Sequence, residues 1–151
     1  MDVARIMNRD VVRVAPDTAL GELIRLQASP VARQLYVTEQ NGHLLGIVTS
    51  FDLLKRFVPE YLDSNLSKLI VAADEFLADT FDANRTVLAR EIMTRDFESL
   101  QLGASVLDAD AIMVHRRFNA MPVLDAQGTL LGEVSRKDIL SHIVRIARLA
   151  E

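Results

Sequence analysis

Two short segments of this 151-residue chain place a glycine, a hydroxyl residue and an aspartate at the same spacing. Each predicts a strand that ends in the hydroxyl residue and a helix whose first turn holds the aspartate. A helix start offers unpaired N–H groups and a positive dipole end, which suit a phosphate. An ionised carboxylate accepts hydrogen bonds from both hydroxyls of a ribose, and a glycine can let a ligand approach the backbone. The pattern therefore predicts nucleotide-binding corners at Gly46, Thr49, Asp52 and at Gly132, Ser135, Asp138.

The same spacing has a purely structural interpretation. Thr or Ser followed three residues later by an acidic residue is also the capping-box pattern of a helix start, and a capping box needs no ligand. A cap alone does not require the surrounding glycine and hairpin to recur with it. Their recurrence at one fixed offset favours the ligand-binding hypothesis over the cap alone.

The two corners belong to an internal repeat. Shifting the chain by 86 residues aligns residues 3–57 with 89–143 without a gap, and twelve positions are identical. A missed repeat would lead to the wrong fold, so this alignment organises the interpretation. We predict one unit at 1–58, a helical insert at 59–88, and a second unit with a C-terminal helix at 89–151.

Both units carry the same order of predicted elements, β-α-β-β-α. Hydrophobic spacing and turn residues predict short extended segments at 10–14 and 96–100, and helices that begin near Leu20 and Val106. Asp17 or Thr18, and Ser105, are the expected N-caps. Hairpin strands follow at 34–38 and 44–49, with a turn at Asn41-Gly42 and the matching Gln127-Gly128. Second helices are expected at 51–57 and from Lys137 to about Ala150, with Ile139, Leu140, Ile143, Val144 and Ala147 on one face.

A unit of this size buries too little apolar surface to be comfortable alone. We therefore expect an α+β fold in which the tandem repeats pack as a pseudo-two-fold pair, with equivalent loops meeting at two clefts. Apolar residues in the insert also follow helical spacing. A connecting helix is expected there, either packed on its own repeats or used for dimerisation or docking. Its apolar residues are Leu66, Leu69, Ile70, Ala73, Phe76 and Leu77, with Ser64 or Asn65 as the cap.

Composition excludes several function classes. The chain has no cysteine, so disulfides, thiolate metal sites and cysteine nucleophiles are excluded. Seventeen basic against twenty-one acidic residues give a charge of −4, which argues against nucleic acid as the main partner. His43, His115 and His142 show no metal-ligand spacing. Because hydrolase, P-loop and dinucleotide motifs are missing from the sequence, we expect no enzyme and no required cofactor.

Apolar runs are shorter than the roughly 18 residues that a membrane span needs. The first residues also lack the long apolar segment of a signal peptide. We therefore expect a cytoplasmic protein with no membrane partner.

Together these motifs resemble a pair of cystathionine-β-synthase (CBS) domains, the arrangement called a Bateman module. The resemblance covers nearly the whole chain apart from the insert and the tail. Its most specific parts are the Ile-Met entry segments, the Met121-Pro122-Val123 strand start and the two Gly-x-x-Thr/Ser-x-x-Asp corners. The resemblance implies a regulatory module, often a homodimer, that binds adenosine-containing molecules in its clefts.

Carried over by position, the resemblance implies ribose contacts for Asp52 and Asp138, with Thr49 and Ser135 near the ribose or phosphate. Walls for the base are implied at Val11, Val12, Leu35 and Tyr36 in the first site, and at Phe97, Glu98, Met121 and Pro122 in the second. Tyr36 stands where the family pattern has a proline, and Glu133 stands where the first copy has Ile47.

Basic residues favour the second site for a phosphorylated ligand, because His115-Arg116-Arg117 and Arg136-Lys137 flank its helices. Cations at a helix C-terminus can also merely complement its dipole. Arg33, Lys55 or Arg56 can reach a phosphate if the clefts form between the copies.

The leading hypothesis is a sensor of AMP, ADP, ATP or S-adenosylmethionine that signals to an unidentified partner by population shift. The alternative is a ligand-free dimerisation or protein-docking module. An enzyme with unusual residues, and a pyrimidine, guanine or single-stranded nucleic acid ligand, remain open.

Overall fold

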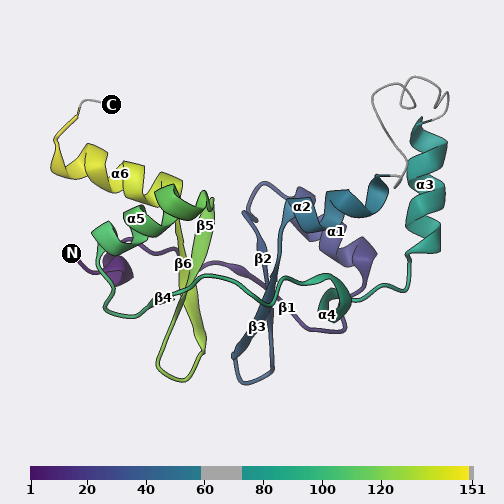
Figure 1. Cartoon of the computed structure of the whole chain (residues 1–151), viewed down its shortest axis with the longest axis horizontal. Helices are drawn as coiled ribbons and strands as arrows, with labels where there is room; N and C mark the ends of the chain where they lie inside the picture. The colour runs from purple at the N-terminus through teal and green to yellow at the C-terminus, as the bar shows by residue number, and fades with distance from the viewer. Residues whose placement is uncertain (59–72, 150–151) are drawn as a thin grey trace.

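The computed structural model describes residues 1–58 and 73–149. In these ranges each repeat forms a three-stranded mixed sheet, with its longer helices gathered at one end and its hairpin projecting from the other (Figure 1). In the first repeat, 3-10 helix η1 (Val3–Arg5) precedes β1 (Val12–Val14), α1 (Leu20–Ala28), β2 (Leu35–Thr38), β3 (Leu44–Val48), α2 (Ser50–Leu54) and 3-10 helix η2 (Lys55–Phe57). Next come α3 (Ala73–Ala83), α4 (Ala89–Ile92), β4 (Leu100–Gln101), α5 (Val106–Arg116), β5 (Ala120–Leu124), β6 (Leu130–Ser135) and α6 (Arg136–Ile146).

The two sheets have the same topology. The first strand of each runs parallel to the second, which pairs antiparallel with the third across a hairpin. Even the irregularity in register recurs at equivalent places, between Val37 and Thr38 and between Val123 and Leu124. The predicted α+β fold and its duplicated order of elements are therefore confirmed.

The sheets face each other across a small apolar core. Tyr36, Leu44 and Ile47 from the first sheet pack there against Leu124 and Leu130 from the second. At the hairpin tips the backbone N–H of Leu44 donates to the Gly128 carbonyl at 3.1 Å. The Leu130 N–H donates to the Gly42 carbonyl at 3.0 Å. These contacts hold the copies as a pseudo-two-fold pair.

The entry segments of the two repeats are exchanged in space. Val3 and Met7 are buried in the core of the second sheet, whereas Ile92 and Met93 are buried in the core of the first. Backbone pairing follows the same exchange: Asn8 bridges to Glu133 in β6, and Thr94 bridges to Ile47 in β3. Each core is thus completed by residues from the other repeat, which the sequence repeat alone does not reveal.

Some predicted helix ends require correction. Ser105 caps α5 as expected, but the N-cap of α1 is Ala19 without a side-chain bond, so Asp17 and Thr18 are not caps. The Thr18 hydroxyl instead donates to the Ala15 carbonyl at 2.7 Å, which closes a turn ahead of the helix.

Helix α6 also differs from its prediction. It ends at Ile146, before a left-handed Arg148 at φ 54°, rather than near Ala150, which lies outside the described residues. Ile139 and His142 are buried on the helix, while Leu140, Ile143 and Val144 remain exposed. The predicted apolar face is therefore covered along one edge only.

The insert contributes helix α3, which packs on the first repeat through its C-terminal half. Phe81 contacts the first core, and its ring lies 3.1 Å from the position that a Cβ on Gly21 would occupy. Arg56 donates to the Asn84 side chain at 3.2 Å. This part of the insert therefore forms the expected connector, whereas Leu66, Leu69, Ile70 and the caps Ser64 and Asn65 lie outside the described residues.

Candidate functional site

Both predicted corners form complete capping boxes at helix starts. The Asp52 backbone N–H donates to the Thr49 hydroxyl at 3.2 Å, and Asp52 Oδ2 accepts from the Thr49 N–H at 2.9 Å. The same geometry recurs at Ser135 and Asp138, with distances of 3.1 and 2.8 Å. The capping interpretation is therefore observed at both corners. It leaves one oxygen of each carboxylate outside the capping box.

The glycines of the corners serve the exchanged entry segments. A Cβ on Gly46 would lie 2.7 Å from Met93 Sδ, and one on Gly132 would lie 2.6 Å from the Asn8 carbonyl oxygen. Real Cβ contacts this short are essentially absent from proteins. The expectation that these glycines admit a ligand is wrong, because the crossing chain already occupies the space beside them.

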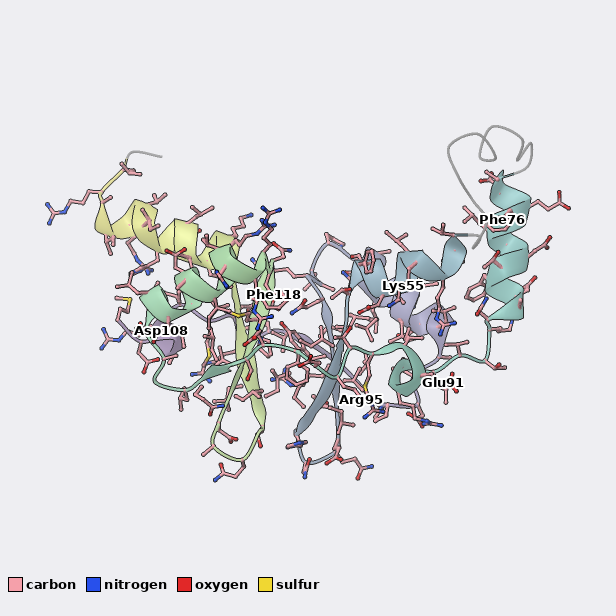
Figure 2. The ribbon with its side chains drawn as sticks, viewed as in Figure 1. Lys55, Phe76, Glu91, Arg95, Asp108 and Phe118 are labelled. Carbon is pink, nitrogen blue, oxygen red and sulfur yellow. The ribbon has the colours of Figure 1, made fainter. Side chains whose placement is uncertain are left out.

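A cleft lies beside the first corner, between the two repeats. It has a cavity volume of about 350 Å³, which lies within the range of small-molecule sites. Thr49, Asp52 and Lys55 line one side, and the other side comes from the exchanged segment and the second repeat. That second group includes Thr94, Phe97, Glu98, Phe118 and Met121. Figure 2 shows Lys55 on the first repeat and Phe118 ahead of β5 on the second.

The cleft combines predicted residues in a different way from the sequence expectation. Phe97, Glu98 and Met121 were expected in the second site, yet they face Asp52 of the first corner. The exchange of entry segments explains this pairing. Thr94 pairs with Ile47 in β3 of the first repeat, so residues 94–98 pass beside the first corner before the chain enters the second sheet. Pro122, their expected neighbour, is fully buried in β5.

Asp52 is held in place while keeping acceptor capacity toward the cleft. Its carboxylate is buried, with 4% of the residue exposed. Oδ1 has longer polar contacts, to Lys55 Nζ at 3.4 Å and the Thr94 hydroxyl at 3.4 Å. An ionised carboxylate offers about four lone-pair positions. Because the Oδ1 contacts are the longer ones, a ligand donor can replace them while the capping contacts of Oδ2 stay in place.

Several cleft residues were missed by the sequence analysis, among them Thr94, Phe118 and Gln34. Thr94 lies at the exchanged crossing, Phe118 precedes β5, and Gln34 precedes β2. Thr94 directly follows the Ile92-Met93 entry motif. The motif would have pointed to Thr94 as a residue of the first cleft only if the exchange of entry segments had been known.

At the second corner, side chains of the first repeat contact Asp138 and Glu133 directly. Arg33 Nη1 lies 3.3 Å from Asp138 Oδ2 and 3.6 Å from Glu133 Oε1. The Tyr36 hydroxyl donates to Glu133 Oε2 at 2.5 Å, and Gln34 Nε2 donates to the Tyr36 hydroxyl at 3.0 Å. Burial raises the pKa of Glu133, although Tyr36 and Arg33 oppose that shift. Burial and the neighbouring Glu133 carboxylate raise the pKa of Tyr36 well above its ordinary value.

The remaining residues predicted for the first site lie mostly in packed cores. Leu35 is fully buried in the first core, and Val12 packs against its edge. Val11 packs against the core between the sheets, beside Tyr36. The structure therefore places these four side chains in packing contacts rather than together along an open wall.

The basic residues expected near the second corner are dispersed. Arg116 pairs with Glu98 at 3.0 Å, at the edge of the first cleft. Arg136 donates to Asn119 at 3.1 Å, and together with Arg117 it lines a groove between α5 and α6. Lys137 is exposed. The basic residues predicted there therefore do not converge on Asp138, and the cation that reaches it is Arg33 of the first repeat.

Neither metal ligands nor a membrane span is found in the described ranges. Within residues 1–58 and 73–149, His, Asp and Glu side chains form no group of three that could hold a metal ion. No helix in those same ranges is long and apolar enough to cross a membrane.

The duplicated fold and paired corners define a tandem-repeat module with a cleft between its copies. The CBS domain family model matches residues 3–59 and 89–145. The chain therefore belongs to the CBS domain family, as a pair of CBS domains.

Relatives and solved structures agree with this assignment. An uncharacterized protein of Methanocaldococcus jannaschii is 28% identical, and the match covers 95% of this chain and 92% of the relative. A CBS domain-containing protein of Dictyostelium discoideum is 25% identical with the same coverage. The structure of CBSX2 from Arabidopsis thaliana in complex with AMP has a TM-score of 0.75 at 21% identity, covering 97% of this chain and 98% of that one.

A second solved structure is a CBS domain pair in complex with 5′-methylthioadenosine and S-adenosylmethionine. Its TM-score is 0.70 at 19% identity, again covering 97% of this chain and 98% of that one. At these identities the likeness to both solved structures concerns the fold.

Proposed function

We propose that this protein is a regulatory module that binds an adenosine-containing ligand in the cleft beside Asp52. The observation that carries the proposal is the meeting of unlike groups across that cleft. Asp52 offers carboxylate acceptors for a ribose, while Phe97 and Met121 offer apolar surface for a base. Similar CBS pairs have been crystallised with AMP and with S-adenosylmethionine, which supports this class of ligand.

The charge of the cleft favours a ligand with few phosphates. Its lining includes the carboxylates of Asp52, Asp96 and Glu98 against the single ammonium of Lys55, among the residues that the structure describes. Arg116 offsets Glu98 from the edge of the cleft. Like charges disfavour one another more strongly near a protein than in bulk water. We therefore favour AMP or S-adenosylmethionine over ATP.

Ligand binding would act on the arrangement of the two repeats. A molecule that contacts Asp52 of the first repeat and Met121 of the second favours the arrangement in which both contacts form. It shifts the population only by the difference in its affinity for the alternative arrangements. This population shift is the signal that a regulated partner would read.

We also propose a homodimer. The outer surfaces of α5 and α6 carry exposed apolar side chains beside an open groove, and such patches on soluble proteins commonly mark contact surfaces. Val114, Leu140 and Ile143 are 74%, 61% and 43% exposed in the single chain.

The test of the ligand proposal is thermal unfolding with AMP, ADP, ATP, S-adenosylmethionine and GTP. A ligand at about 100 times its dissociation constant adds about 2.7 kcal/mol, on the order of 5 to 10 °C for a chain of this size. Asp52→Ala is expected to abolish the shift. The matched control is Asp108→Ala, which removes the same capping-box position from α5. Figure 2 shows Asp108 at the far end of the second repeat.

The control separates loss of a cap from loss of binding. Both variants lose a capping contact, so both should unfold at lower temperature without ligand. Only Asp52→Ala should also lose the ligand-induced shift. No shift of the wild type with any of the five compounds would contradict the proposal and favour the docking module. An equal loss of shift in both variants would show that the effect comes from the cap.

A further inference from the structure

The two corners are equivalent by sequence but differ in the side chains that surround the aspartate. The shift of 86 residues relates four positions around Asp52 to four around Asp138. At the first corner these positions are mostly apolar, whereas at the second they carry opposite charges and hydrogen-bonding groups. They are Ile47, Asn119, Ala120 and Pro122 in the first case, and Glu133, Arg33, Gln34 and Tyr36 in the second.

Arg33 adds a charged donor to the Asp138 carboxylate, at the oxygen that also caps α6. Its Nη1 donates to Asp138 Oδ2 at 3.3 Å. The same oxygen accepts from the Ser135 N–H and hydroxyl, both at 2.8 Å. A guanidinium presents several N–H donors in a fixed plane. Like the two hydroxyls of a ribose, it can therefore donate hydrogen bonds to a carboxylate.

Glu133 makes displacement of Arg33 unfavourable. Its side chain is 4% exposed, and a buried carboxylate is costly unless it is paired and hydrogen-bonded. The Tyr36 hydroxyl donates to one oxygen, and Arg33 faces the other at 3.6 Å. If a ligand displaced Arg33, the buried Glu133 carboxylate would keep the neutral Tyr36 hydroxyl as a donor but would lose the guanidinium that faces it.

The Gln34 side-chain nitrogen extends this network to the other repeat. Gln34 Nε2 donates to the Tyr36 hydroxyl at 3.0 Å and to the Ala120 carbonyl at 3.2 Å. Ala120 stands at the position equivalent to Gln34 in the other repeat. The network therefore extends from Asp138 to Gln34 and Ala120, which line the first cleft, and it joins the two repeats between the two corners.

We infer that Arg33 is an internal occupant of the second cleft, so that the chain binds one adenosine-containing molecule, beside Asp52. The inference rests on the proposed function for its ligand class and adds the number and location of sites. Arg33 and Glu133 act together: Arg33 satisfies Asp138, and Glu133 holds Arg33 in place.

The test exchanges the second corner for residues of the first. The double variant Arg33→Asn, Glu133→Ile copies Asn119 and Ile47, and it removes one positive and one negative charge. The matched control is Arg25→Gln, Glu22→Gln, which removes the exposed ion pair of α1 with the same change in charge. Equilibrium dialysis with radiolabelled AMP, and separately with S-adenosylmethionine, measures the number of molecules bound per chain.

The wild type and the control pair are expected to bind one molecule per chain of at least one probe, and Asp52→Ala none. The exchanged variant is expected to bind two, and adding Asp138→Ala should return it to one. If the exchanged variant does not fold by circular dichroism, Arg33→Gln replaces it and should show a second, weaker equivalent.

Two equivalents in the wild type, or one in every folded Arg33 variant, would overturn the inference and leave the proposed function standing. Binding by the exchanged variant alone, lost with Asp138→Ala, would support Arg33 as the occupant of the second cleft but overturn the site at Asp52. Absence of binding in all variants with both probes would overturn both.

Discussion

Alanine at Gly132 and at Gly46 should destabilise the protein to different degrees, because the crossing segment meets each glycine with a different group. Neither glycine has the positive φ that disfavours alanine, so contacts decide the outcome. A Cβ at position 132 meets the Asn8 carbonyl oxygen at 2.6 Å, whereas ordinary contacts begin at 3.4 Å. The backbone would have to move by about 0.8 Å in the direction of contact. At position 46 the obstacle is mainly the Met93 side chain.

A shift of the Asn8 backbone would weaken its two backbone hydrogen bonds with Glu133. Asn8 N–H donates to the Glu133 carbonyl at 2.8 Å, and Glu133 N–H donates back at 2.9 Å. Overpacking costs about 1 to 3 kcal/mol and each weakened bond up to about 1 kcal/mol. The lower entropy of an unfolded chain with alanine offsets about 0.5 to 1 kcal/mol. We expect Gly132→Ala to lower the free energy of unfolding by about 2 to 4 kcal/mol.

Gly46→Ala should cost less, about 1 to 2 kcal/mol, because a methionine side chain can rotate. Urea unfolding without ligand measures both values. Gly21→Ala is the control, since α1 gains a better helix former and meets only the far end of the Phe81 ring. The reasoning would be refuted if Gly132→Ala changed stability by less than about 0.5 kcal/mol. It would also be refuted if Gly46→Ala cost more.

Two further predictions concern the buried acid and the helix surface. Because the folded protein raises the pKa of Glu133 above its ordinary 4.5, protonation favours the fold. Stability from this group is fully present below the ordinary pKa and is lost as pH rises through the raised one. Glu133→Gln should remove that loss, and parallel plots of unfolding free energy against pH for the two proteins would contradict this. Leu140→Asp should shift the proposed homodimer to monomer, as measured by sedimentation equilibrium at micromolar concentration. Leu102→Asp, at another exposed leucine, is the control and should leave the dimer intact. An unchanged mass of the Leu140→Asp variant would exclude α6 from the interface.

The repeat allowed much of the fold to be predicted, because two copies of each pattern constrain one another. The hairpin at Gly42 and the cap at Ser105 depend on neighbours in sequence, and both were found there. The N-cap of α1 was missed because Ala19 offers no side-chain signal: the N–H of Leu20 is instead satisfied by the distant Val87 carbonyl at 2.9 Å. The division at 1–58, 59–88 and 89–151 stays a prediction.

The candidate site was predicted less completely than the fold, for a physical reason. Residue types at the corners depend on local spacing, so Thr49 and Asp52 could be identified. Which base wall faces which corner depends on the path of the chain between repeats, and that path is set by long-range packing of Met7 and Met93. The role of Arg33 was weighed only as a phosphate contact, because sequence spacing cannot show a contact across 105 residues.

Capping and ligand binding are compatible at Asp52, and this compatibility decides how its variants should be interpreted. Oδ2 holds the helix start through the Thr49 N–H and hydroxyl at 2.9 and 3.0 Å, while the contacts of Oδ1 are longer, at 3.4 Å. A ribose could therefore be bound without releasing the cap. At Asp138 the cap is just as complete, but Arg33 adds a charged donor to Oδ2. The duplicated cap preserves the fold at both corners, and the side chain that faces each carboxylate determines whether the corner can accept a ligand.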